Sequence, residues 1–183
     1  MAPFAEPKLR PVLGNNDLTK VRRVLDIGCG PGTNTRHFLN CDYLGIDFNE
    51  EYISSARRRF GQRFMVADVT TLVFPPDQRF DFVLMNSLLH HLDDTQVRRL
   101  LSHVTDLLSE DGCVHITELV LPDHSSIPQL LARIDRGHYA RRLERWQELF
   151  SEVFRPVLFE PFSVTGFGVP LWDLVYFKGC ARS

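Results

Sequence analysis

The sequence is poor in lysine and has no long apolar run. Only Lys8, Lys20 and Lys178 among its 21 basic residues are lysines, and without a lysine cluster or basic tail we expect no nucleic-acid partner. No apolar stretch approaches the roughly 20 residues that span a bilayer, so we expect no membrane partner. The N-terminus lacks the basic start and apolar stretch of a secretory signal.

Cysteine is also scarce and has no metal-binding spacing. The four cysteines, at 29, 41, 113 and 180, form no C-x-x-C pair. This predicts free thiols in a reducing compartment, and neither a disulfide framework nor a zinc site. With 44% hydrophobic and 24% charged residues over 183 positions, we expect one globular cytoplasmic domain without a metal.

Strand and helix patterns alternate from residue 22 onward. Prolines at 3, 7 and 11 predict a loose N-terminal arm over residues 1–20. The expected strands are 22–28, 43–48, 63–69, 80–87 and 113–121, and helices are expected after Thr33, over 49–60 and after Asp94. Such alternation predicts βαβ units and a mainly parallel sheet with helices on both faces.

The last third has a different pattern. Residues 125–154 predict two consecutive helices, or one that is broken. The runs 157–164 and 171–179 are joined by "TGFGVP", a link too short for a crossover helix, so they must pair antiparallel. The predicted fold is α/β: a single Rossmann-like, doubly wound sheet of seven strands, mostly parallel, with an antiparallel C-terminal hairpin.

Three glycines follow the first predicted strand in "DIGCGPG", at positions 28, 30 and 32. A strand, glycine turn and helix suit a charged nucleotide cofactor. A nicotinamide or flavin site would have glycine or alanine at Thr33, and a P-loop would have G-K-[ST]. None of the four tyrosines precedes a lysine by four residues, so the short-chain dehydrogenase pattern is absent too.

The stretch "VLDIGCGPGTNT", an acidic residue ending the second strand and "ADV" ending the third together resemble the class I S-adenosylmethionine-dependent methyltransferases. The resemblance covers roughly residues 22–121 and implies that S-adenosylmethionine is the cofactor. The residues that it implies for cofactor binding are Asp26, Gly28, Cys29, Gly30, Gly32, Asp47, Phe48, Asp68, Val69 and Asn86.

Each of these positions has an expected task. Close backbone approach at the glycines would let exposed N–H groups meet the cofactor carboxylate, and Asp26 would attract its ammonium. Asp47 would accept the ribose hydroxyls, with Phe48 packed beside it. Asp68 and the Val69 N–H would meet the adenine, and the backbone of Asn86 would meet the methionine amine.

The acceptor is less clearly marked, because methyl transfer mainly requires alignment. Candidate general bases are His91, which can titrate near pH 7, and Glu118; His90, His138 and Tyr139 lie nearby, with core packing as the simpler interpretation of Tyr139. The sequence has "NSLL" after the fourth strand, where the family's amino methylators carry N-P-P-[YF] or D-P-P-[YF]. It also lacks the P-C nucleophile of the cytosine enzymes there. These absences favour a small-molecule acceptor, methylated on oxygen or nitrogen.

Two further hypotheses stay open. The chain could be a cofactor-binding regulatory partner of the same fold, or a protein or RNA methyltransferase that docks through its arginine-rich helix. Those arginines, at 133, 136, 141, 142 and 145, are also compatible with an ion-paired solvated face. Because the N-terminal arm is short, we expect residues 122–154 to form a helical lid over the substrate. The oligomeric state is not indicated.

Overall fold

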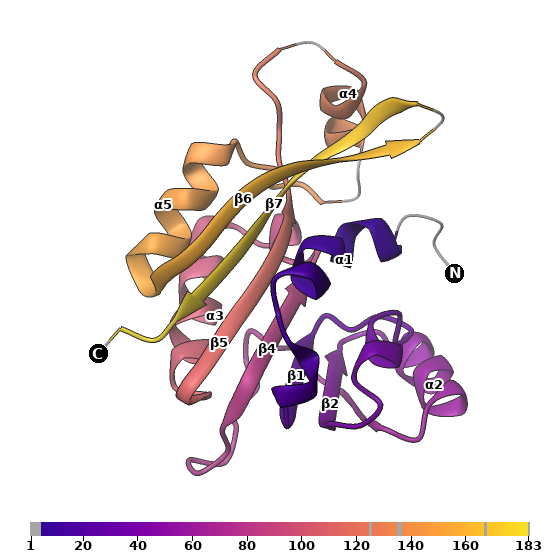
Figure 1. Ribbon diagram of the computed structural model, residues 1–183, viewed down its shortest axis with the longest axis vertical. Coiled ribbons are helices and arrows are strands. Elements are labelled where there is room, and N and C mark those ends of the chain that lie inside the picture. Colours follow the sequence, from indigo (N-terminus) through magenta and orange to yellow (C-terminus); the bar gives the residue numbers. More distant parts are fainter. Residues whose placement is uncertain (1–4, 125, 135–136, 167, 183) are drawn as a thin grey trace.

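The computed structural model describes residues 5–124, 126–134, 137–166 and 168–182 (Figure 1). Within them, seven strands form one sheet in the order β3-β2-β1-β4-β5-β7-β6. The strands are β1 Arg23–Ile27, β2 Asp42–Asp47, β3 Arg63–Val66, β4 Phe80–Asn86, β5 Leu108–Leu119, β6 Arg155–Gly166 and β7 Val169–Cys180. The first five pair parallel, whereas β7 pairs antiparallel with β5 and β6. The predicted fold class is confirmed.

Helices cover both faces of the sheet. The α-helices are α1 Ala5–Gly14, α2 Glu50–Arg59, α3 Asp94–Thr105, α4 Ile127–Ile134 and α5 Leu143–Val153, and the 3-10 turns are η1 Leu18–Lys20, η2 Thr35–His37 and η3 Leu89–His91. Buried residues of α1 and α2 share one apolar cluster, and those of α3 and α5 share the other. The result is a three-layer arrangement with the sheet in the middle.

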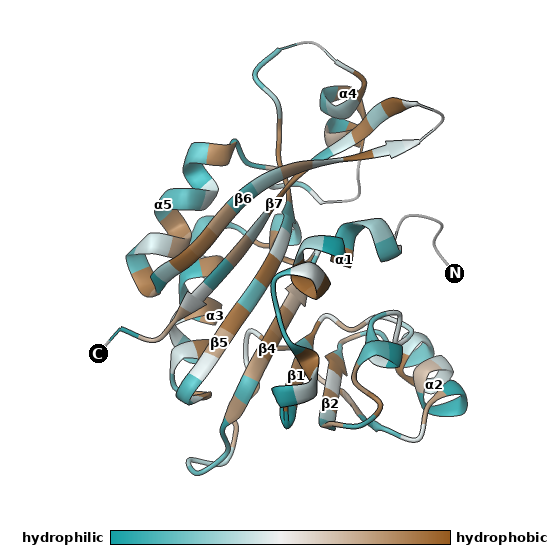
Figure 2. Ribbon diagram, viewed as in Figure 1, coloured by the Kyte–Doolittle hydropathy of each residue, from teal (hydrophilic) through white to brown (hydrophobic). Residues whose placement is uncertain are grey.

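Strand β4 shows how the sequence builds both layers. Its side chains point to alternate faces, as in any strand, so Phe82 and Leu84 join the α1–α2 cluster while Val83 and Met85 join the α3–α5 cluster. All four are nearly or completely buried. The central strands are accordingly the most hydrophobic part of the ribbon in Figure 2.

Two helix starts follow from local side-chain chemistry. Asn49 accepts a hydrogen bond from the Tyr52 N–H and caps α2. Asp93 and Gln96 form a reciprocal capping box at the start of α3. Both motifs satisfy backbone donors that a helix leaves without partners. The expected starts of these two helices are confirmed to within a residue.

The N-terminal arm is not loose, contrary to the sequence prediction. It forms α1, with Pro7 in the first turn and Pro11 inside the helix. Leu9 and Val12 are 1% and 0% exposed in the α1–α2 cluster. Proline is tolerated in a first turn, and burial of two apolar side chains offsets the hydrogen bond lost at Pro11.

The helix expected after Thr33 is also wrong. Only the turn η2 forms there, and the Asn34 side chain does not cap it. Fourteen residues connect β1 to β2, and the glycine turn uses the first of them. The remainder is too short for a packed crossover helix.

Two strand boundaries and the packing of one side chain also differ from the prediction. Strand β3 ends at Val66 rather than Val69, and β5 begins at Leu108 rather than Cys113. Tyr139 precedes α5 and is 43% exposed, so its predicted core packing is wrong.

The expected lid is shorter than residues 122–154. Its C-terminal part, α5, belongs to the core because Trp146, Leu149 and Phe150 are fully buried. Helix α4 lies outside both layers, beside the projecting β6–β7 hairpin (Figure 1). Residues 125, 135 and 136 of the segment, including Arg136, lie outside the described residues.

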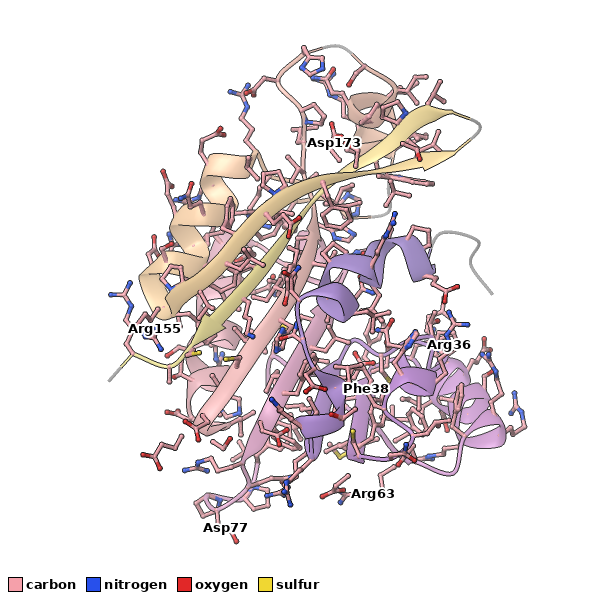
Figure 3. All side chains as sticks on the ribbon, in the orientation of Figure 1. Arg36, Phe38, Arg63, Asp77, Arg155 and Asp173 are labelled. Atoms are coloured by element: carbon pink, nitrogen blue, oxygen red, sulfur yellow. The ribbon has the colours of Figure 1, made fainter. Side chains whose placement is uncertain are left out.

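Figure 3 marks the two ends of the sheet. Arg63 and Asp77 lie at the lower end, and Asp173 lies at the upper end on the hairpin. The strands β1 to β5 run upward, so their carboxyl ends meet at the upper end.

All four cysteines are free thiols, as predicted. No helix in the described ranges is long and apolar enough to span a membrane.

Candidate active site

The turn after β1 depends on glycine for its shape. Gly28, Gly30 and Gly32 have φ values of 73°, 53° and 77°, a region that side chains with a Cβ rarely adopt. A Cβ at Gly28 would lie 3.0 Å from a methyl group of Leu88, whereas a Cβ at Gly30 would have nothing within 4 Å. The turn therefore packs tightly below Leu88 and faces open space at Gly30.

Hydrogen bonds attach this turn to the end of β2. The N–H groups of Gly28 and Cys29 both donate to the Ile46 carbonyl, at 2.8 and 3.0 Å. The Gly30 N–H donates to Asp47 Oδ2 at 2.9 Å. These amides already have partners inside the protein, so the expectation that exposed N–H groups of the loop meet a carboxylate is wrong for these three.

Asp47 is a buried carboxylate at the carboxyl end of β2. Its other oxygen, Oδ1, accepts from the Asn49 N–H at 2.9 Å, and the residue is 9% exposed. Each carboxylate oxygen can accept about two hydrogen bonds. Asp47 is thus held rigidly and retains acceptor capacity at both oxygens.

Asp26, in β1, is fully buried below the turn. Its Oδ2 accepts from the Tyr43 hydroxyl at 2.7 Å and from Asn34 Nδ2 at 3.4 Å. Its Oδ1 is buried and has no hydrogen-bond partner. Burial raises the pKa of Asp26 to about 6, against the lowering effect of these two donors, and the charge of Asp47 raises it further.

The network continues to the end of β4. Asn86 Nδ2 donates to Asn34 Oδ1 at 3.4 Å, and Ser87 Oγ donates to Asn86 Oδ1 at 3.3 Å. Asn34, which is 5% exposed, therefore connects Asp26 with Asn86. Neither Asn34 nor Tyr43 was predicted from the sequence to take part in this network.

The remaining predicted cofactor residues lie at the same edge of the sheet. Phe48 follows Asp47 and is 77% exposed. The Ala67 N–H donates to the Asp47 carbonyl at 3.0 Å, which places Asp68 and Val69 just beyond the end of β2. Asp68 is not at a strand end as expected, because it lies in a turn where its Oδ1 accepts from the N–H and hydroxyl of Thr70.

Glu118, near the end of β5, is buried against the loop that follows β4. It is 0% exposed, and its Oε1 accepts from the N–H groups of Leu88 and Leu89 at 2.7 and 2.5 Å. Its Oε2 lies 2.7 Å from His90 Nδ1. Burial alone would raise the pKa of Glu118, but the His90 charge and these hydrogen bonds outweigh it, so the pKa is lowered.

Glu118 therefore fixes the loop that carries Leu88 over Gly28. His91 is exposed beside His90, with ring centroids 4.3 Å apart. The sequence pattern named the His-His pair but did not distinguish a buried partner of Glu118 from an exposed neighbour.

The segment before α5 packs against the loop after β4 and forms hydrogen bonds with it. A Cβ at Gly137 would lie 2.0 Å from the His90 ring, and the Tyr139 N–H donates to the His90 carbonyl. Arg141, only 8% exposed, donates to the carbonyls of Leu89 and Leu92. His138 is exposed.

Three described members of the arginine cluster, Arg141, Arg142 and Arg145, form ion pairs within the protein. Arg141 and Arg145 both pair with Asp94, and Arg145 also pairs with Glu148. Arg142 pairs with Asp123 at 2.8 Å. These contacts agree with the interpretation of the region as an ion-paired face.

Comparison with known proteins relates the chain to methyltransferases. Residues 24–112 match a family described as "Methyltransferase domain". The chain is 32% identical over 143 residues to trans-aconitate 2-methyltransferase of Methylobacterium nodulans, covering 72% of this chain and 52% of that protein. It is 27% identical over 188 residues to the enzyme of the same name from Shigella dysenteriae, covering 95% and 69%.

Solved structures share the fold. A SAM-dependent methyltransferase of Methanosarcina mazei superposes with a TM-score of 0.76 at 19% identity, covering 94% of this chain and 98% of that one. The N-methyltransferase NodS of Bradyrhizobium japonicum, solved with S-adenosylhomocysteine, gives 0.75 at 18% identity, covering 99% and 89%. Residues 24–112 thus belong to a methyltransferase domain family, and the fold is that of the S-adenosylmethionine-dependent methyltransferases. This methyltransferase-family chain spans about half the length of the first curated relatives that it matches.

The residues of the chain fit the cofactor of this family. S-adenosylmethionine carries an ammonium, a ribose diol and an adenine. The unpartnered Oδ1 of Asp26 suits a cation, and the remaining acceptor capacity of Asp47 suits a diol. Exposed Phe48 suits an aromatic base. No group of three or more metal-ligating side chains occurs among the residues described.

The raised pKa of Asp26 makes stability depend on pH in a defined direction. The folded pKa, about 6, exceeds the unfolded value, so Asp26 favours folding when protonated and this benefit is lost as the pH rises through about 6. At about 1.4 kcal/mol for each pKa unit, the ionised group costs the folded protein about 3 kcal/mol near pH 8.

We therefore expect Asp26→Asn to be more stable than the wild type at pH 8, by up to about 3 kcal/mol, and to lose that advantage near pH 4. Urea denaturation at both pH values measures the difference. Asp42→Asn, at the opposite end of β2, is the matched control. A difference between wild type and Asp26→Asn that does not change with pH would contradict the raised pKa.

Proposed function

We propose that this protein is an S-adenosylmethionine-dependent methyltransferase that methylates an oxygen or nitrogen atom of a small-molecule acceptor. The observation that carries the proposal is the connected set of groups at the carboxyl ends of β1, β2 and β4. It combines a glycine turn with left-handed backbone, an unpartnered buried oxygen on Asp26 and the rigidly held carboxylate of Asp47. The family relationship supports the same reading.

The chain's own residues would hold the cofactor as follows. Asp26 and the backbone near Asn86 would receive the ammonium, and a cation there would also relieve the cost of ionising Asp26. Asp47 would accept the ribose hydroxyls, and Phe48, Asp68 and the Val69 N–H would surround the adenine. When bound, the cofactor supplies a methyl group activated by its positive sulfur.

A carboxylate is the acceptor group that we favour. Two curated relatives are named for trans-aconitate, a tricarboxylate, and the chain covers 52% and 69% of their lengths. The ion pairs of Arg141, which precedes α5, and of Arg145 in α5 give no support to an RNA-docking surface. The free thiols support a reducing compartment, which we take to be the cytoplasm.

Cofactor binding can be tested by substituting the aspartates at the two ends of β2. Asp47→Ala should weaken S-adenosylhomocysteine binding by about 1.5 to 3 kcal/mol, the scale of hydrogen bonds to a charged group. Asp42→Ala, at the other end of β2 where Asp42 pairs with Arg63, should leave the affinity unchanged. Calorimetry measures both. Equal affinities for the two variants would refute the ribose assignment.

The acceptor chemistry determines whether His91 acts as a base. A carboxylate is already ionised at neutral pH and gives up no proton, so His91→Gln should lower kcat for trans-aconitate less than about threefold. With a neutral hydroxyl or amine acceptor, loss of a general base would cost roughly 10²- to 10⁴-fold. The assay uses labelled methyl donor and product mass spectrometry, with His103→Gln, on α3, as the control.

The same assay separates the rival functions. Turnover of trans-aconitate or of a molecule in a metabolite pool supports the proposed activity. Binding of S-adenosylhomocysteine without any turnover would favour a regulatory protein that retains the fold. Methylation of added RNA or protein instead of small molecules would favour the third hypothesis.

We further propose that α4, Ile127–Ile134, forms the lid. Helix α4 exposes three apolar side chains, Ile127, Leu130 and Ile134, by 51%, 61% and 67%. Their spacing puts them on one helix face. The face is outside both core clusters, so it is available to cover an acceptor.

Replacing Ile127, Leu130 and Ile134 by serine should therefore change the KM of the acceptor several-fold, by loss of roughly 1–3 kcal/mol of apolar contact, without changing S-adenosylhomocysteine affinity. Steady-state kinetics and calorimetry measure the two quantities. A folded variant whose cofactor affinity collapses would show that α4 is not an acceptor lid.

A further inference from the structure

Two of the three lysines lie away from the glycine turn. Lys20 ends η1 at the lower end of the sheet, pairs with Asp17 at 3.5 Å and has a side chain that is 83% exposed. Lys178 donates to Asn16 Oδ1 at 2.9 Å. Lys20 and Lys178 line a cavity with residues just before β1 and near the start of β4. Lys8 is the lysine at the upper, functional end.

Two contacts, with the residue after β4 and with β7, fix the position of Lys8 in α1. Its Nζ donates to Ser87 Oγ at 3.3 Å and lies 5.8 Å from the centroid of the Trp172 ring. Its helix is anchored by fully buried Leu9 and Val12. The ammonium is therefore held by α1, the end of β4 and the upper part of β7, rather than placed on a freely moving chain.

Ser87 marks this point as unusual. It has φ of 58°, and among the described residues no other non-glycine has positive φ. Its N–H donates to the Thr117 carbonyl at 2.8 Å, which extends the β4–β5 pairing by one residue. Strained backbone of this kind persists where the surrounding structure enforces it, and it concentrates at binding and catalytic sites.

The place of Lys8 in the sheet separates it from the three aspartates assigned to the cofactor. Asp26, Asp47 and Asp68 belong to β1, β2 and the segment after β3, on one side of the central strand β4. Ser87 directly follows β4, next to Asn86, and Trp172 belongs to β7, on the other side of β4. Trp172 also lies beyond the last β5–β7 pair, Leu119 with Leu174, and so on the projecting hairpin beside α4 (Figures 1 and 3).

We propose that Lys8 determines acceptor specificity by binding a carboxylate of a small di- or tricarboxylate, with Ser87 and Trp172 fixing the direction of its ammonium. This inference rests on the proposed function and names the residue that selects the substrate. A primary ammonium binds a carboxylate as a compact charge with three donors. An acceptor with one carboxylate on Lys8 can present a second one to the methyl donor.

The test compares full-length wild type with Lys8→Met, Lys8→Arg and the matched control Lys20→Met. Calorimetry first measures S-adenosylhomocysteine affinity for each protein. It then measures the binding of trans-aconitate, citrate and fumarate to each protein saturated with S-adenosylhomocysteine. The trimethyl ester of trans-aconitate is the uncharged probe, and kcat and KM are measured for any probe that is methylated.

We expect Lys8→Met to weaken binding of at least one of the three carboxylates by roughly 10- to 100-fold, the range for a charge-assisted hydrogen bond. Its S-adenosylhomocysteine affinity and its affinity for the ester should stay within about twofold of wild type on the same argument. Lys8→Arg should recover most of the loss, and Lys20→Met should resemble wild type. Melting temperatures identify any variant that does not fold; if Lys8→Met does not, Lys8→Gln, which also removes the charge, replaces it and should show the same loss.

Several results would overturn the inference. One is a Lys8→Met protein that loses S-adenosylhomocysteine affinity but keeps carboxylate affinity, because Lys8 would then serve the donor. Others are unchanged carboxylate affinity in the folded Lys8 variants, or no carboxylate binding by wild type. Failure of wild type to bind S-adenosylhomocysteine is a separate outcome, which refutes the proposed function itself.

Discussion

The buried carboxylate of Asp26 is the constraint on which the upper end of the sheet depends. A carboxylate taken out of water requires donors, and Tyr43 and Asn34 supply them to one oxygen. Burial and the charge of Asp26 also raise the pKa of Tyr43 well above its usual value, so its hydroxyl stays protonated and donates. The second oxygen is unpartnered and raises the cost of ionisation. The protein thus holds a site whose electrostatic cost is relieved when a cation arrives.

The same network connects β1, β2 and β4, of which β4 is distant in the sequence from the other two. Asn34 comes from the β1–β2 connection, and Asn86 comes from the end of β4. Glu118, at the end of β5, stabilises the adjoining loop by accepting from two backbone N–H groups and by contacting His90. Replacement of the expected crossover helix by a short turn is compatible with this arrangement, because hydrogen bonds to β2 hold the glycine turn in place.

On the other side of the site, helix α1 supplies a hydrogen-bond donor for an anion, which the glycine turn does not. The amides of Gly28, Cys29 and Gly30 already donate within the protein, so they do not offer a surplus of donors to an anion. Helix α1 brings Lys8 to the end of β4 instead. Lys8 consequently lies beside the end of β4 and β7, whereas Asp26 and Asp47 lie on β1 and β2, and this difference underlies the separate assignment of donor and acceptor positions.

The sequence by itself determined the positions of the first five strands along the chain, their parallel pairing, the C-terminal hairpin, the glycine turn and the acidic residues Asp47 and Asp68. These depend on local signals: short apolar runs, glycine where φ is positive, and caps such as Asn49 and Asp93. Tertiary structure alone decided that α1 forms across Pro11, that α5 joins the core, and that His90 rather than His91 meets Glu118. Each of these depends on burial against residues distant in the chain, as Leu9 and Val12 show. The energies of such contacts are comparable to or larger than local propensities, and they are not encoded in any short window of sequence.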